Sequence, residues 1–252
     1  LKIGIMKGNA ESMFTYGSIL LLDPKNVTEG CQYIEKSIEK GCTTALLAYG
    51  YYLDHGEGVN VNKEKACHYY KMAADNGEIR GMFRYGSKLD KGEGITTDKA
   101  QAFRYFQMAA ERGHVKSMFN LGNMLVKGLG TQSNKAEAAN YYKKAADKGH
   151  VRAMLNYAEM LKDGIGVNTD KEKAAYYYKM AADKGNSIAM CKYGYMRSKG
   201  QGIEVNNEEA AYYYKKAADC GNAKAMFNYG CMLNKGRGVQ ASEEQATRYF
   251  KM

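Results

Sequence analysis

The groups that could do chemistry in this chain are few, and the first are its glycine-rich loops. Six Gly-x-Gly pairs recur along the sequence, for example at the ends of Lys91–Gly94 and Lys235–Gly238. Glycine-rich backbone can wrap a phosphate group, but none of these loops continues to the Gly-Lys-Ser/Thr of a phosphate-binding loop, and none follows a predicted strand. We therefore predict that the loops are structural turns.

The histidines and cysteines lack the spacing of a metal or catalytic site. There is no HExxH or CxxC pattern, and no Ser/His/Asp or Cys/His arrangement can be argued from the sequence. We therefore predict no metal, no cofactor and no catalytic residue, and we read the cysteines as reduced residues of a cytoplasmic protein. The histidines are His55, His68, His114 and His150, and the cysteines are Cys31, Cys42, Cys67, Cys191, Cys220 and Cys231.

A 36-residue period organises the whole chain. Segments such as AADKG end at glycines spaced 36 residues apart, and a tyrosine stands eight residues before each glycine. The glycines are Gly41, Gly77, Gly113, Gly149, Gly185 and Gly221. The tyrosines are Tyr33, Tyr69, Tyr105, Tyr141, Tyr177 and Tyr213, and Tyr249 continues the series. Such regularity indicates one environment repeated along the molecule.

Each repeat divides into two helices. A residue that can cap a helix stands fifteen positions before each glycine, and in four repeats a Gln or Glu three positions later predicts a capping box. The first helix then runs about thirteen residues to the AADKG turn, and a second helix runs to the Gly-x-Gly pair. We predict an all-α fold, an α/α superhelical solenoid of helix-turn-helix repeats. The caps are Asn62, Asp98, Asn134, Asp170, Asn206 and Ser242.

Small residues and tyrosines predict the packing between these helices. Paired alanines such as Ala145 and Ala146 let two backbones approach, while tyrosine rings fill the space above them. Glycine replaces Ala158 at the corresponding position of most other second helices, where it costs about 1 kcal/mol relative to alanine. We expect close helix contact there. Neighbouring repeats must stack, because one hairpin cannot bury this face alone.

The repeat resembles the Sel-1-like repeat, a relative of the tetratricopeptide repeat. The match rests on Ala-x-x-Tyr-Tyr-x-Lys-Ala-Ala-Asp-x-Gly, a small-x-x-x-Leu/Tyr-Gly segment and Gly-x-Gly-Val, and it covers about residues 5–252. The resemblance implies a superhelix whose concave groove binds proteins, in adaptor, scaffold or signalling assemblies. We expect residues 1–252 to form one array of six to seven repeats, cut within a repeat at both ends and belonging to a longer protein.

Some relatives named by this resemblance carry a disulfide in each hairpin and are associated with penicillin binding. Here the cysteines occupy different repeat positions, which argues against that activity. Other relatives are subunits of membrane-associated degradation complexes or lie beside protein-kinase domains. The sequence does not select among these settings, and no apolar stretch approaches the roughly 18 residues of a membrane span.

Variable positions of the first helix are the predicted partner-binding surface. The residues one position before the repeating tyrosine and those four positions later share a helix face. By the resemblance, this face should line the groove, where methionine and tyrosine suit an adaptable partner surface. The predicted residues are His68, Arg104, Asn140, Tyr176, Tyr212, Arg248, Met72, Met108, Lys144, Met180 and Lys216. The alternative is that they form ordinary variable surface.

The charge of the chain bears on its partners. Lys and Arg number 37 against 27 Asp and Glu, a net charge of +10. We predict a noncatalytic scaffold or adaptor that binds a helix or peptide of other proteins, with a preference for acidic segments. Two alternatives stay open: a nucleic-acid-binding solenoid, which we consider less favoured because the tyrosines occupy core positions, and a regulatory arm of a larger signalling protein.

Overall fold

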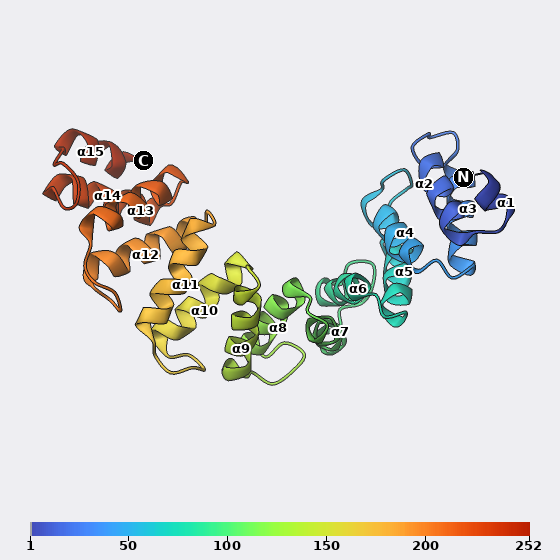
Figure 1. The fold of residues 1–252 in the computed structure, drawn as a ribbon, viewed down its shortest axis with the longest axis horizontal. Coiled ribbons are helices and arrows are strands. Elements are labelled where there is room, and N and C mark those ends of the chain that lie inside the picture. The colour runs from blue at the N-terminus through green and yellow to red at the C-terminus, as the bar shows by residue number, and fades with distance from the viewer. Residues whose placement is uncertain (1) are drawn as a thin grey trace. The chain divides into compact units, whose positions relative to one another are not determined.

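The computed structural model describes residues 2–252, and all regular structure among these residues is helical (Figure 1). The helices are α1 Lys2–Met6, α2 Ala10–Leu20, α3 Val27–Glu39, α4 Thr43–His55, α5 Lys63–Asp75, α6 Ile79–Lys91, α7 Lys99–Glu111, α8 Val115–Lys127, α9 Lys135–Asp147, α10 Val151–Asp163, α11 Lys171–Asp183, α12 Ser187–Lys199, α13 Asn207–Asp219, α14 Ala223–Lys235 and α15 Glu243–Lys251. Each repeat pairs an odd-numbered helix with the even-numbered helix that follows it. The predicted solenoid of helical repeats is confirmed.

The predicted caps begin the odd-numbered helices from α5 onward. The side chain of Asp98, for example, accepts a hydrogen bond from the Gln101 backbone amide at 2.8 Å, and the other five caps bind in the same way. The predicted capping box is wrong at this repeat. The Gln101 amide contacts the Asp98 carboxylate instead, and the Asp98 backbone N–H donates to the carbonyl of Leu89 at the end of the preceding helix. The boxes predicted at Asn206 and Ser242 are wrong for the same reason, since their backbone N–H groups donate to the carbonyls of Arg197 and Leu233.

Two kinds of glycine permit the turns. Gly185, between α11 and α12, has a φ of 88°, which an L side chain rarely adopts. Gly166, after α10, also has a positive φ of 70°, and it lies directly against the carbonyl of Lys135 at the start of α9. The Gly-x-Gly loops are therefore turns that, from Gly94 onward, also pack against the start of the odd-numbered helix of the same repeat.

Tyrosine pairs and alanines make the core. Tyr157 of α10 and Tyr177 of α11 meet edge to face, with ring centroids 4.9 Å apart. The edge-to-face pair recurs in other repeats, at Tyr16–Tyr33, Tyr85–Tyr105, Tyr193–Tyr213 and Tyr229–Tyr249. Tyr49 and Tyr69 also pack together, with their rings tilted at 57°. Gly194 has the predicted close contact: a methyl group there would stand 3.1 Å from the ring of Tyr214. The predicted role of the repeating tyrosines in packing is confirmed.

The repeats group into two compact units. The first ends at Gln132 and the second runs from Ser133 to Met252. Each unit has its own candidate site. In the part of the chain that the structure describes, every helix is too short or too polar to cross a bilayer.

Candidate protein-binding surfaces

The predicted partner-binding residues lie on the outward face of the odd-numbered helices. Met72 and Met180 are half-buried, and the other nine are exposed. Tyr176 and Tyr212 are 60% and 52% exposed, which is high for side chains of this size. The Lys216 ammonium lies 4.5 Å from the centroid of the Tyr212 ring, within cation–π distance. Binding by these eleven residues stays a prediction.

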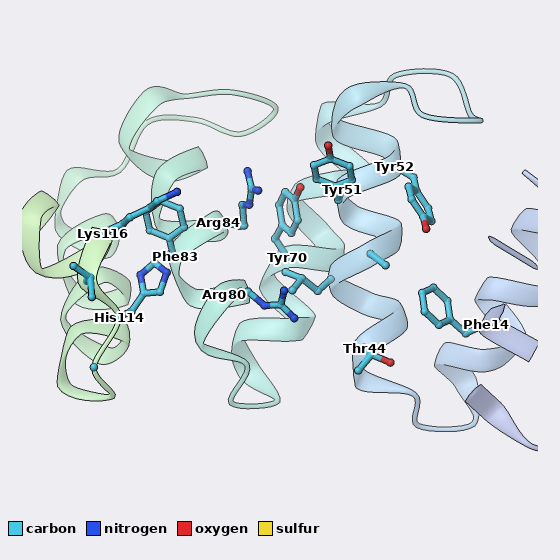
Figure 2. Close-up of a pocket in the computed structure, with 14 residues that line it drawn as sticks. Phe14, Thr44, Tyr51, Tyr52, Tyr70, Arg80, Phe83, Arg84, His114 and Lys116 are labelled. Carbon is cyan, nitrogen blue, oxygen red and sulfur yellow. The ribbon is translucent and has the colours of Figure 1, made fainter. Parts of the chain in front are cut away.

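A hollow in the first unit lies elsewhere, along the even-numbered helices. Its volume is about 760 Å³, and none of the eleven predicted residues lines it. Aromatic side chains form much of its wall, with Tyr51 and Tyr52 on α4 and Phe83 on α6 (Figure 2). Phe14 of α2 and His114, at the start of α8, also line it. This surface combines apolar area with polar ring atoms, as protein-binding surfaces do.

Three cations also line this hollow. Arg80 and Arg84 extend from α6 and Lys116 from α8, all toward the same hollow (Figure 2). The guanidinium of Arg84 lies 5.8 Å from the centroid of the Tyr51 ring. No Asp or Glu lines the hollow, and among residues 2–252 no carboxylate forms an ion pair with Arg80, Arg84 or Lys116. The positive potential is therefore directed at whatever occupies the hollow.

His114 connects this hollow to helix stability. Its Nδ1 accepts a hydrogen bond from the backbone amide of Ser117 at 3.3 Å and therefore caps α8. Burial, and secondarily the charge of Lys116, lower the pKa of His114 below its usual 6.5. The neutral ring is the form that can accept the capping hydrogen bond, so the burial and the cap favour the same protonation state.

A second hollow, of about 610 Å³, lies within the second unit. Its apolar wall includes Ile188 and Tyr195 of α12, both exposed. Four lysines and one aspartate also line it, namely Lys162, Lys171, Lys192, Lys224 and Asp163. Like the first hollow, it presents more positive than negative charge to a ligand.

The residues of both hollows were not predicted, although the sequence contains a signal for them. Arg80 and Arg84 stand three and seven positions after Gly77, and they share a helix face because they are four apart. The same two positions give Thr44 and Ala48 in the first hollow and Ile188 and Lys192 in the second. Comparing the variable positions of the even-numbered helices would therefore have identified this face as well.

The side chains that could bind a metal ion do not gather at one place in the described residues. Within residues 2–252, no three His, Cys, Asp or Glu side chains are placed to hold a metal ion together. The cysteines are unpaired, and Cys67 and Cys191 are buried. Burial raises the pKa of both of these thiols, which keeps them in the less reactive protonated form.

Fold and surfaces together define a class: a helical-repeat solenoid, an architecture commonly used for contacts between proteins. The Sel1 repeat profile matches six consecutive segments, residues 43–78, 79–114, 115–150, 151–186, 187–222 and 223–252. The chain belongs to the Sel1 repeat family. A comparison with curated protein sequences found no match.

Solved structures agree with this assignment. A protective antigen of uropathogenic Escherichia coli strains, described as displaying an SLR fold, is 29% identical with a TM-score of 0.91. That match covers 98% of this chain and 54% of the antigen, so the chain spans about half the antigen's length. A Sel1 repeat protein from Oxalobacter formigenes is 30% identical with a TM-score of 0.75, and the match covers 95% of each chain.

Proposed function

We propose that this chain is a noncatalytic protein-binding module whose first unit holds an acidic segment of a partner protein in the hollow between α4, α6 and α8. The observation that carries the proposal is the set of three unpaired cations, Arg80, Arg84 and Lys116, around an aromatic wall without a lining carboxylate. Opposite charges across an interface guide association and select the partner, and aromatic rings provide buried area.

The eleven exposed residues of the odd-numbered helices form a second candidate surface of the same function. Tyr176 and Tyr212 favour it, because tyrosine and arginine dominate the binding energy of many interfaces. The two surfaces carry different residues, so substitutions can separate them.

Peptide display tests the proposal without knowledge of the partner. The native chain would select from a random peptide library, beside an Arg80→Glu/Arg84→Glu variant and a Lys148→Glu/Lys184→Glu variant. The control variant has the same change in charge at exposed lysines that line neither hollow. Circular dichroism would first show that all three chains are folded.

We expect the native chain and the control to enrich peptides that combine Asp or Glu with an apolar residue, and the Arg80/Arg84 variant to lose them. Equal enrichment by all three chains would contradict binding in the first hollow. If a Tyr176→Ala/Tyr212→Ala variant lost the acidic peptides instead, binding would be assigned to the odd-numbered helices. If the chain retained no acidic peptide but bound RNA offered separately, with an affinity that falls steeply with salt, the nucleic-acid alternative would be supported.

A further inference from the structure

A buried ion cluster in the first unit shows how this repeat holds a carboxylate. Asp54, at the end of α4, is 4% exposed, and its Oδ1 accepts hydrogen bonds from Lys63 at 2.7 Å and from Lys88 at 2.6 Å. The hydroxyl of Tyr70 donates to its Oδ2 at 3.5 Å. Three donors from two helices, Lys63 and Tyr70 of α5 and Lys88 of α6, thus converge on one carboxylate of the chain itself.

The second unit retains two of these donors and lacks the carboxylate. Three repeats later, 108 residues along, Lys171 corresponds to Lys63 and Tyr178 to Tyr70, while Lys162 stands in the place of Asp54. Lys162 cannot accept a hydrogen bond, because an ammonium group has only donors. The position that holds an acid in the first unit therefore holds a further donor in the second, where Asp163 is the carboxylate that lines the hollow.

The hydroxyl of Tyr178 lacks the carboxylate acceptor that Tyr70 has. The side chain is fully buried, and its oxygen has no hydrogen-bond partner. In the equivalent position of the next repeat, Tyr214 lies 3.5 Å from the hydroxyl of Ser198, so the orphaned hydroxyl is particular to the repeat with Lys162. A buried hydroxyl without a partner is unfavourable, because nothing compensates for its lost hydrogen bonds to water. Burial, followed by the charges of Glu159 and Asp163, raises the pKa of Tyr178, so the hydroxyl keeps its proton and can donate.

Tyr178, Lys162 and Lys171 all line the hollow of about 610 Å³, so a ligand that enters it lies beside them. Two cations there already have partners: Lys162 pairs with Asp163 at 3.3 Å and Lys192 with Glu159 at 2.8 Å. No ion pair of Lys171 or Lys224 occurs among the described residues. The hollow thus has unpaired positive charge beside an unpaired buried donor.

We infer that the hollow formed by α10, α11 and α12 binds an Asp or Glu side chain of a partner protein, whose carboxylate occupies the place that Asp54 occupies in the first unit. Tyr178 and Lys171 donate to it as Tyr70 and Lys63 donate to Asp54. Exposed Ile188 and Tyr195 provide the apolar wall for the residues beside the acid. This inference concerns the second unit and deepens the proposed function, on which it rests, by defining a second acid-binding position.

Lys162→Asp is the decisive variant, because it supplies the missing carboxylate from within the chain. We expect two effects together. The urea midpoint of unfolding should rise, since Lys171 and Tyr178 gain an acceptor. The affinity for an acidic ligand should fall, because the new carboxylate occupies the ligand's position. Tyr178→Phe is the companion variant: removal of an unpartnered hydroxyl should leave the midpoint unchanged or raise it, while it weakens ligand binding.

The probe is a capped pentapeptide with four glutamates around one leucine, and its glutamine counterpart is the control. Amide chemical shifts from NMR titration would locate binding on α10–α12 or on α4–α8. We expect the glutamate peptide to shift α10–α12 signals in the native chain, and to bind there about tenfold more weakly in Tyr178→Phe and Lys162→Asp, as loss of one charge-assisted hydrogen bond implies.

The Arg80→Glu/Arg84→Glu variant separates this site from the first hollow, and it should keep the α10–α12 shifts. The inference is overturned if the glutamine peptide shifts α10–α12 as strongly, or if Lys162→Asp leaves both the unfolding midpoint and the peptide affinity unchanged. Loss of shifts on α4–α8 alone would count against the first hollow and leave this site standing.

Discussion

The hydroxyl of Tyr177 donates a hydrogen bond to Oδ1 of Asp147 at 2.8 Å, and it joins α11 to the end of α9 across 30 residues of sequence. Tyr213 and Asp183 repeat the contact at 2.7 Å one repeat later. The same tyrosines pack edge to face against Tyr157 and Tyr193. One residue type thus links three helices in each of these repeats, which explains why tyrosine recurs at this position.

Tyr177→Phe tests this link, because it removes the hydrogen bond and keeps the ring. We expect a loss of about 1 kcal/mol in unfolding free energy, measured by urea denaturation with circular dichroism. Tyr105→Phe is the matched control, since its hydroxyl lies 3.4 Å from Asp75, and it should cost less. Equal losses in the two variants would show that the hydrogen bond to Asp147 contributes nothing.

The Tyr177 contact should also depend on pH. Burial alone would raise the pKa of the Asp147 carboxyl, but hydrogen bonds from Lys143 and Tyr177 hold it below its usual value of 3.8. A lowered carboxyl pKa stabilises the fold above that value, and the contribution is lost as the pH falls through the pKa of the folded state. The difference between the native chain and Tyr177→Phe should therefore be present at pH 7 and shrink below pH 3.8.

Asp54→Asn should be among the more damaging substitutions in the first unit. Lys88 has a side chain only 7% exposed and binds Asp54 at 2.6 Å, so the change leaves a buried ammonium with Glu93 as its remaining partner. We expect a loss of about 3 kcal/mol, at the low end for a broken buried ion pair.

Asp90→Asn is the control for that substitution. Asp90 pairs with Lys99 at 2.7 Å, but both side chains are about one-third exposed, and such a pair is worth about 0–1 kcal/mol. Chemical denaturation of both variants would check the ranking. A loss for Asp90→Asn as large as for Asp54→Asn would contradict the burial argument.

His114 predicts a loss of stability in mild acid. Because its pKa is lowered by burial, the unfolded chain binds a proton more readily than the folded chain does, so stability is full above pH 6.5 and falls as the pH drops through the folded-state pKa. His114→Asn should remove this dependence and keep the cap, as Asn186 and Asn222 cap their helices through the same position. Thermal unfolding between pH 5 and pH 8, compared for the two chains, checks it; identical pH profiles would contradict it.

Gly166 and Gly185 separate two costs of replacing glycine. At Gly185 nothing lies within 4 Å of an added methyl group, so Gly185→Ala should cost only the strain of a positive φ, about 1–2 kcal/mol. Gly166→Ala should cost more, because the methyl group would also overlap the Lys135 carbonyl. Urea midpoints of the two variants give the order, and the reverse order would refute this account of the loop.

The fold was well predicted from the sequence because the same local signals for helices and turns recur in six repeats. Asp98 and its equivalents begin helices, and Tyr157 and Tyr177 fall on facing helices, since both properties depend on spacing within about 40 residues. The hollows were not predicted. Arg80 and Arg84 share a helix face by spacing alone, but whether that face lines a hollow depends on how neighbouring helices stack. The orphaned hydroxyl of Tyr178 was not predicted either: the sequence places Lys162 at the position of Asp54, but only the structure shows that Tyr70 donates to Asp54 and that the Tyr178 hydroxyl is buried without a partner.

The central claim is that the even-numbered helices of the first unit bind an acidic partner segment, and a binding titration tests it most directly. An acidic peptide obtained by display would be titrated calorimetrically into the native chain, Arg80→Glu/Arg84→Glu and the charge-matched Lys148→Glu/Lys184→Glu. We predict equal affinity for the native chain and the control and a loss of at least about tenfold for the Arg80/Arg84 variant. Equal weakening in both variants would show that only net charge matters, and it would contradict a defined site.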